Sequence, residues 1–181
     1  MPLRRTALLL LITLSNTLCA AETVPGCLKR VFDDYCLGGN LQQSMQRHPG
    51  GVPAQRQGDH GAVIYPQGHG RIYVMAYQGR IYKILQTYEP ATQVQFKELL
   101  ERLEEKYGPH RDLSHYPGYA RNRAAQIGAI RRGEGALKYL WQVADQPWRI
   151  ELEWTRRLGI SLAYLANDLD KTQSAALDQG L

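Results

Sequence analysis

Residues 71–87 read RIYVMAYQGRIYKILQT and carry the clearest strand pattern in the chain. The first half alternates between two sets of side chains, Ile72, Val74 and Ala76 on one side and Tyr73, Met75 and Tyr77 on the other. Gln78-Gly79 favours a tight turn, and a second strand runs from Ile81 to about Thr87. We predict a β-hairpin with the aliphatic set facing the core. The tyrosine and methionine face is either a second packed layer under a helix or an exposed docking surface.

The last third of the chain predicts three more strands. Apolar residues alternate in the segments 139–143, 148–154 and 160–164, and turn residues separate these segments. Arg149, Glu151 and Glu153 lie on the other face of the middle segment. One apolar and one polar face are typical of an antiparallel sheet that is half exposed to water.

Helical patterns flank these strands. Thr92 followed by Gln95 predicts a capped helix that ends at Gly108-Pro109. Asn40 predicts a cap for a short helix over residues 41–47, and the spacing of apolar residues predicts a helix over residues 27–36. Residues 50–61 and 110–135 are predicted as loops, the latter with a helical turn near 120–130, and a strand is predicted over 62–65. We expect an α+β fold, in which a hairpin and a three-stranded meander form an antiparallel sheet with the helices on one face.

The N-terminus resembles a secretory signal peptide. Arg4 and Arg5 precede the apolar stretch Ala7–Ile12, which is too short to span a bilayer, and cleavage is predicted after Ala20 or Ala21. Removing residues 1–21 leaves 160 of the 181 residues and lowers the formal net charge from +5 to +3. The predicted organisation is a signal peptide (1–21), one domain (22–168) and a C-terminal tail (169–181). A retained membrane anchor is the alternative.

The cysteines agree with export but leave two alternatives open. Cys19 falls within the signal peptide, and Leu18 before it departs from the small residue that a lipoprotein signal requires. Cys27 and Cys36 then remain, and an exported pair suggests a disulfide. In a continuous helix, however, a separation of nine positions places the two about 13 Å apart, which is beyond disulfide reach. Either the helix is broken or both thiols are buried and free.

The order of elements, with Leu103–Pro109 followed by strands that contain tryptophan, resembles two small bacterial envelope domains. These are the β-lactamase-inhibitor protein and the small lipoprotein of the outer-membrane barrel-assembly machinery. The resemblance implies a binding module whose sheet or loops engage another protein.

No catalytic set assembles in the sequence. There is no GxSxG motif and no CxxC pair, so we predict neither catalytic residues nor a cofactor. His60 and His69 lie among glycines and offer one alternative, a small metal-dependent hydrolase in which both imidazoles share a metal ion. Glycine-flanked histidines are also common in surface turns.

The segment 111–132 is rich in arginine with interleaved tyrosine. Its candidate binding residues are Arg111, Tyr116, Tyr119, Arg121, Arg123, Arg131 and Arg132. Such residues bind anionic groups and are frequent at protein interfaces, although a solvated connecting loop has the same composition. In an exported protein we expect an acidic ligand or an envelope protein, not nucleic acid. The sequence therefore predicts a soluble, non-enzymatic binding module in the periplasm or outside the cell.

Overall fold

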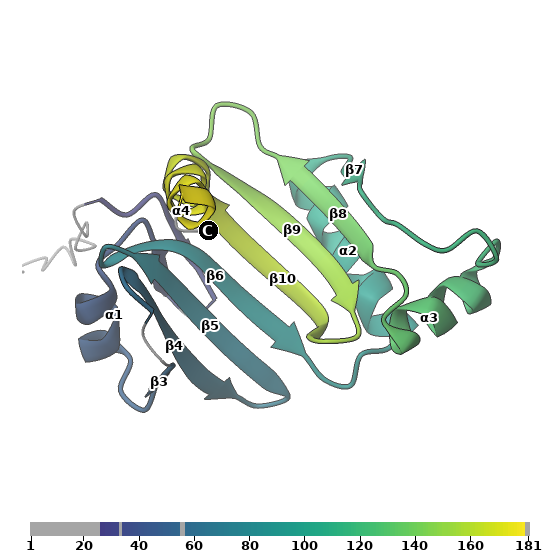
Figure 1. Cartoon of the computed structure of the whole chain (residues 1–181), viewed down its shortest axis with the longest axis horizontal. Helices are drawn as coiled ribbons and strands as arrows, with labels where there is room; N and C mark the ends of the chain where they lie inside the picture. Colours follow the sequence, from purple (N-terminus) through teal and green to yellow (C-terminus); the bar gives the residue numbers. More distant parts are fainter. Residues whose placement is uncertain (1–25, 33, 55–56, 180–181) are drawn as a thin grey trace, which may run out of the picture.

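The computed structural model describes residues 26–32, 34–54 and 57–179 and shows an α+β fold with one large antiparallel sheet (Figure 1). The eight strands of this sheet are, in spatial order, β3 (Val52–Pro53), β4 (His60–Gln67), β5 (Gly70–Tyr77), β6 (Arg80–Tyr88), β10 (Gly159–Ala166), β9 (Trp148–Thr155), β8 (Leu137–Gln142) and β7 (Arg111–Asp112). Outside it are the two-stranded sheet β1 (Lys29–Val31) and β2 (Tyr35–Leu37), and the helices α1 (Leu41–Arg47), α2 (Gln93–Tyr107), α3 (Arg123–Arg132) and α4 (Asn167–Gln179). The predicted signal peptide lies outside the described residues.

The large sheet consists of two meanders joined side by side. The chain forms β4, β5 and β6, leaves the sheet through α2, adds the short edge strand β7, and after α3 continues as β8, β9 and β10. The last strand then pairs with β6, with Tyr164 opposite Ile84. The hairpin turn between β5 and β6 has positive φ at both Gln78 and Gly79, as a type I′ turn requires. The predicted hairpin and meander are both confirmed, but short strands at both edges extend the sheet beyond the prediction.

The main core lies on one face of this sheet, between the strands and α2. Its largest fully buried side chains are Leu37, Val63, Ile72, Ile81, Ile84, Phe96, Ile130, Leu137, Trp141, Ile150, Leu152 and Ile160. The predicted inward set of the hairpin, with Val74 and Ala76, is among the buried residues. Burial of each large apolar side chain contributes about 1.5–3 kcal/mol, so this face holds the fold together.

Helix α2 begins and ends as its sequence predicts. The Thr92 hydroxyl accepts a hydrogen bond from the Gln95 amide at 3.2 Å. Gly108 ends the helix with a φ of 78°, and its carbonyl accepts a hydrogen bond from the Trp141 indole at 2.9 Å. The end of α2 is therefore attached to β8.

The helices do not all lie on one face, contrary to the prediction. In Figure 1, α2 passes behind the sheet whereas α4 lies in front of it. The tail that is predicted after residue 168 is largely α4, whose Asp170 carboxylate accepts a hydrogen bond from Arg149 of β9 at 2.6 Å. No helix in the described part of the chain is long and apolar enough to cross a membrane.

The predicted helix over residues 27–36 is wrong. This segment forms the hairpin of β1 and β2, with positive φ at Phe32 and Asp34 in the connection. Because the hairpin folds the chain back on itself, the Cα atoms of Cys27 and Cys36 lie 5.5 Å apart and the two residues form a disulfide. The distance objection applied only to a continuous helix.

Reduction of the Cys27–Cys36 disulfide is expected to lower the free energy of unfolding by about 2–3 kcal/mol, because the bond closes a short loop in the unfolded chain. Urea unfolding with and without reductant measures the change. The double variant C27S/C36S is the control, since its unfolding should not respond to reductant. Two free thiols in the mass of the non-reduced, alkylated protein would contradict the prediction.

Candidate functional site

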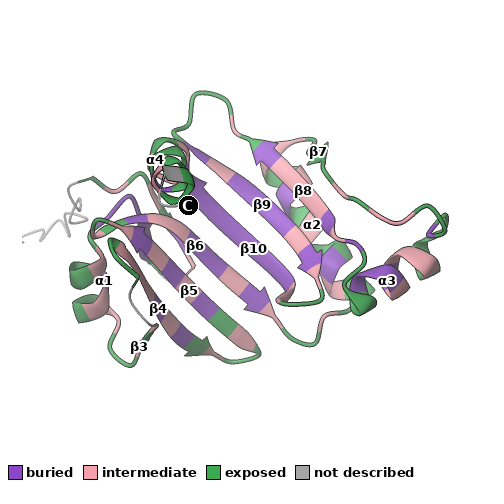
Figure 2. Ribbon diagram, viewed as in Figure 1, coloured by how far each residue is buried: buried purple, intermediate pink, exposed green. Residues whose placement is uncertain are grey.

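The sheet face opposite the main core is only partly covered. Leu85, Ala163 and Leu165 form a small second cluster there, and Tyr73 and Leu158 pack against it. Figure 2 shows buried residues along β10, and α4 is the one described helix that lies in front of this face. The residues on the tyrosine and methionine face of the hairpin therefore have different surroundings. Tyr73 belongs to the second cluster, and the Met75 sulfur is 4.0 Å from the hydroxyl of Tyr82.

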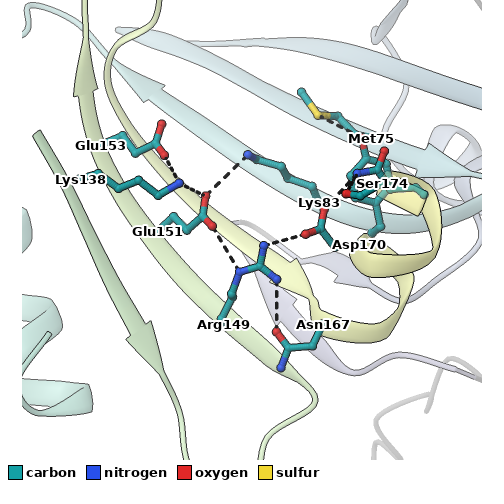
Figure 3. Close-up of polar contacts among 11 residues, drawn as sticks. Met75, Lys83, Lys138, Arg149, Glu151, Glu153, Asn167, Asp170 and Ser174 are labelled. Atoms are coloured by element: carbon teal, nitrogen blue, oxygen red, sulfur yellow. Dashed lines mark hydrogen bonds and ion pairs between the residues drawn. The ribbon is translucent and has the colours of Figure 1, made fainter. Parts of the chain in front are cut away.

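Beside this cluster, charged residues of three strands form a closed network (Figure 3). Glu151 of β9 is buried and pairs with Lys138 of β8 at 3.1 Å, with Arg149 at 3.2 Å and with Lys83 of β6 at 3.9 Å. Arg149 in turn pairs with Asp170 of α4. Each member has an oppositely charged partner, so this network attaches α4 to the sheet rather than offering a free charge to a ligand.

A different part of the molecule combines a cavity with excess positive charge. An open cavity of about 610 Å³ lies between the end of α3 and the turn that joins β9 to β10. We call it the basic cavity, and its lining residues are His115, Arg132, Gly133, Gly135, Ala136, Thr155, Arg156 and Arg157.

One wall of the basic cavity comes from the end of α3. Gly133 ends this helix in the left-handed conformation, with a φ of 81°. Arg132 donates hydrogen bonds from Nη2 to the Tyr119 hydroxyl at 2.7 Å and from Nε to the Glu134 carboxylate at 3.1 Å. The Tyr119 hydroxyl donates to the same carboxylate. Tyr119 and Arg132 hold the pKa of Glu134 below its ordinary value through these hydrogen bonds, so this carboxyl group is ionised.

The opposite wall comes from the turn between β9 and β10. Arg156 donates from Nη1 to the backbone carbonyl of Arg132 at 3.0 Å, which links the two walls. Arg157 is exposed and makes no hydrogen bond or ion pair with the part of the chain that the structure describes. Its guanidinium group is therefore available to a ligand.

The structure brings together some of the predicted binding residues and separates others. Tyr119 and Arg132 are in contact. Burial raises the pKa of Tyr116, and the positive charge of Arg123 lies close enough to oppose that rise. Arg111 is opposite Leu140 at the sheet edge. The remaining two candidates, Arg121 before α3 and Arg131 in its last turn, do not line the basic cavity.

Sequence analysis missed Arg156 and Arg157, which it treated only as turn residues. Two consecutive arginines in the turn between two apolar strands were the available signal for a binding site. One polar residue with a glycine is enough to form such a turn, so the turn itself does not require them. Their proximity to Arg132 is not visible in the sequence, because Arg156 lies 24 positions after Arg132 in the chain.

The two histidines of the alternative metal site are not brought together. His60 begins β4, and His69 lies in the turn after its last residue. The eight-residue strand between them is about 23 Å long at about 3.3 Å per residue. Among the described residues, no three histidine, cysteine or acidic side chains are grouped so that they would hold a metal ion.

Comparisons with protein-family models, curated proteins and solved structures found no match. The resemblance to the two envelope domains therefore remains a prediction.

Proposed function

We propose that this chain is an exported, non-enzymatic binding module that recognises an acidic ligand, either free or displayed by an envelope protein, at the basic cavity. The observation that carries the proposal is the convergence of Arg132, Arg156 and Arg157 on one open cavity. The disulfide supports the exported compartment, because such bonds persist in oxidising surroundings.

The charge balance of the basic cavity supports an anionic ligand. The three guanidinium groups carry a charge of +3, and Glu134 is the acidic partner of Arg132. A charge of +2 is left over this small region, so an anion that enters the cavity meets a favourable field. Arginine side chains present forked donors that match the oxygens of carboxylate and phosphate groups.

The alternative of a metal-dependent hydrolase has less support. That activity needs His60 and His69 on one metal ion, whereas the length of β4 separates them. Binding at the basic cavity requires no such rearrangement.

Replacing Arg157 with Ala is expected to weaken phosphate binding about tenfold to hundredfold, since a hydrogen bond to a charged group contributes about 1.5–3 kcal/mol. The measurement is a titration of the oxidised mature protein with inorganic phosphate, followed by amide chemical shifts. Arg102→Ala is the matched control, because it removes the same charge from the exposed face of α2. The proposal fails if the native protein binds neither phosphate nor acetate, or if both variants weaken binding equally.

A further inference from the structure

The Glu134 carboxylate is paired with the guanidinium of Arg132, which lines the basic cavity. It accepts from Nε of Arg132 and from the Tyr119 hydroxyl, and the Arg132 guanidinium also lies 5.6 Å from the centre of the Tyr119 ring. A carboxylate so placed makes the contacts that an anionic ligand would make with Arg132. It is an internal anion at a site that otherwise attracts external ones.

The backbone of Glu134 is held more firmly than its side chain. Its amide donates to the Ala129 carbonyl at 2.9 Å as part of the helix end. The next residue, Gly135, packs so closely that a Cβ there would approach the His115 carbonyl to 2.8 Å. The side chain, in contrast, is 45% exposed. The carboxylate can therefore leave Arg132 by rotation of its own side chain, with no change in the fold.

Replacement of this carboxylate by a ligand has a small energetic cost. An exposed ion pair contributes about 0–1 kcal/mol, because water and salt screen it. A ligand that reaches Arg132 together with Arg156 and Arg157 would contact three guanidinium groups, whereas Glu134 contacts one. A dianion also offsets more of the +3 charge of these groups than a single carboxylate does.

We infer that Glu134 is a built-in substitute for the ligand, and that a phosphoryl group replaces its carboxylate on Arg132 while Arg156 and Arg157 bind the remaining phosphoryl oxygens. This inference rests on the proposed function and adds the chemical class of the ligand and the residue that competes with it. A soluble phosphate monoester and the phosphomonoester headgroup of phosphatidic acid present the same chemistry. Because a ligand must displace the Glu134 carboxylate from Arg132, groups with one charge bind more weakly than dianions.

The test is the variant Glu134→Gln, which keeps the shape of the side chain and removes its charge. It is expected to tighten the binding of inorganic phosphate about threefold to fivefold, which corresponds to the loss of one exposed competing ion pair. Glu101→Gln is the matched control, since Glu101 pairs with Lys97 on α2 at 3.4 Å and its replacement changes the net charge equally. The Arg132 Nε signal should shift on phosphate addition in the native protein.

The outcomes separate this inference from the proposed function. If the native protein binds phosphate and Glu134→Gln binds no more tightly than Glu101→Gln, the inference is wrong and the proposed function stands. If acetate binds as tightly as phosphate, the assignment of a phosphoryl group is wrong. If the native protein binds neither anion, the proposed function itself fails. Glycerol phosphate and phosphatidic acid vesicles, with phosphatidylcholine vesicles as the blank, distinguish a free monoester from a lipid headgroup, and binding of either supports the inference.

Discussion

Replacing Glu151 with Gln is expected to lower the free energy of unfolding by about 3–5 kcal/mol. The residue is only 7% exposed, and its carboxylate lies among Lys138, Arg149 and Lys83. The substitution takes from Lys83 its one acidic partner in the described part of the chain and leaves Lys138 and Arg149 with one each, Glu153 and Asp170. A positive charge left uncompensated in a buried ionic cluster costs more than the native arrangement gains. Because Arg149 also binds Asp170, the change should loosen α4 as well.

Urea unfolding at pH 7 measures this effect, and Glu153→Gln is the matched control. Glu153 faces the same side of β9 and pairs with Lys138 at 2.7 Å, but its side chain is 22% exposed against 9% for Glu151. We expect the control to lose about 1 kcal/mol or less. Equal losses in the two variants would show that burial of the Glu151 carboxylate does not determine the effect.

The native protein and Glu151→Gln should differ less in their free energy of unfolding at low pH. Burial by itself would raise the pKa of Glu151, but the charges of Lys138 and Lys83 outweigh it and hold the pKa below its ordinary value of 4.5. A carboxyl group with a lowered pKa in the folded state stabilises the fold above its unfolded pKa, and this contribution is lost as the pH falls through the folded pKa. The gap in unfolding free energy between the native protein and Glu151→Gln is therefore expected to narrow below about pH 4.5. A gap that is constant with pH would contradict the ionised state.

Replacing Phe96 with Ala is expected to lower the free energy of unfolding by a similar amount, about 3–5 kcal/mol. The Phe96 side chain is 1% exposed, and its ring centre lies 5.7 Å from that of Tyr139 and 6.0 Å from that of Trp154. Truncation removes a fully buried contact of the first turn of α2 with the sheet and leaves a cavity between two layers. The reason for the cost is lost apolar burial together with that cavity.

Val94→Ala provides the control for Phe96→Ala, because Val94 lies two residues earlier on the same helix and is 67% exposed. We expect its effect on unfolding to be within about 0.5 kcal/mol. Thermal and urea unfolding of both variants measure the difference. A loss below about 1 kcal/mol for Phe96→Ala would mean that α2 is not part of the cooperative core.

Local patterns in the sequence determine the elements whose partners are close in the chain. The β5–β6 hairpin follows from alternation and a glycine turn, and α2 follows from its cap at Thr92 and its end at Gly108. The pattern failed at residues 27–36, since apolar residues spaced for a helix also suit a short hairpin. There, contacts with the distant sheet decided the conformation: Val31, Tyr35 and Leu37 pack into the main core.

The candidate site divides in the same way. Arg132 and Tyr119 could be selected from composition alone, because both fall in one arginine-rich segment. Arg156 and Arg157 belong to another part of the chain, and only strand pairing brings them near: Leu137 of β8 lies opposite Trp154 of β9, which places the end of α3 beside the β9–β10 turn (Figure 1). The sequence by itself determined the strands of the hairpin and of the C-terminal meander, the capped helix and the basic segment, because these depend on neighbouring residues. The tertiary structure decided the basic cavity, because its charges converge only through a register between strands that no local pattern specifies.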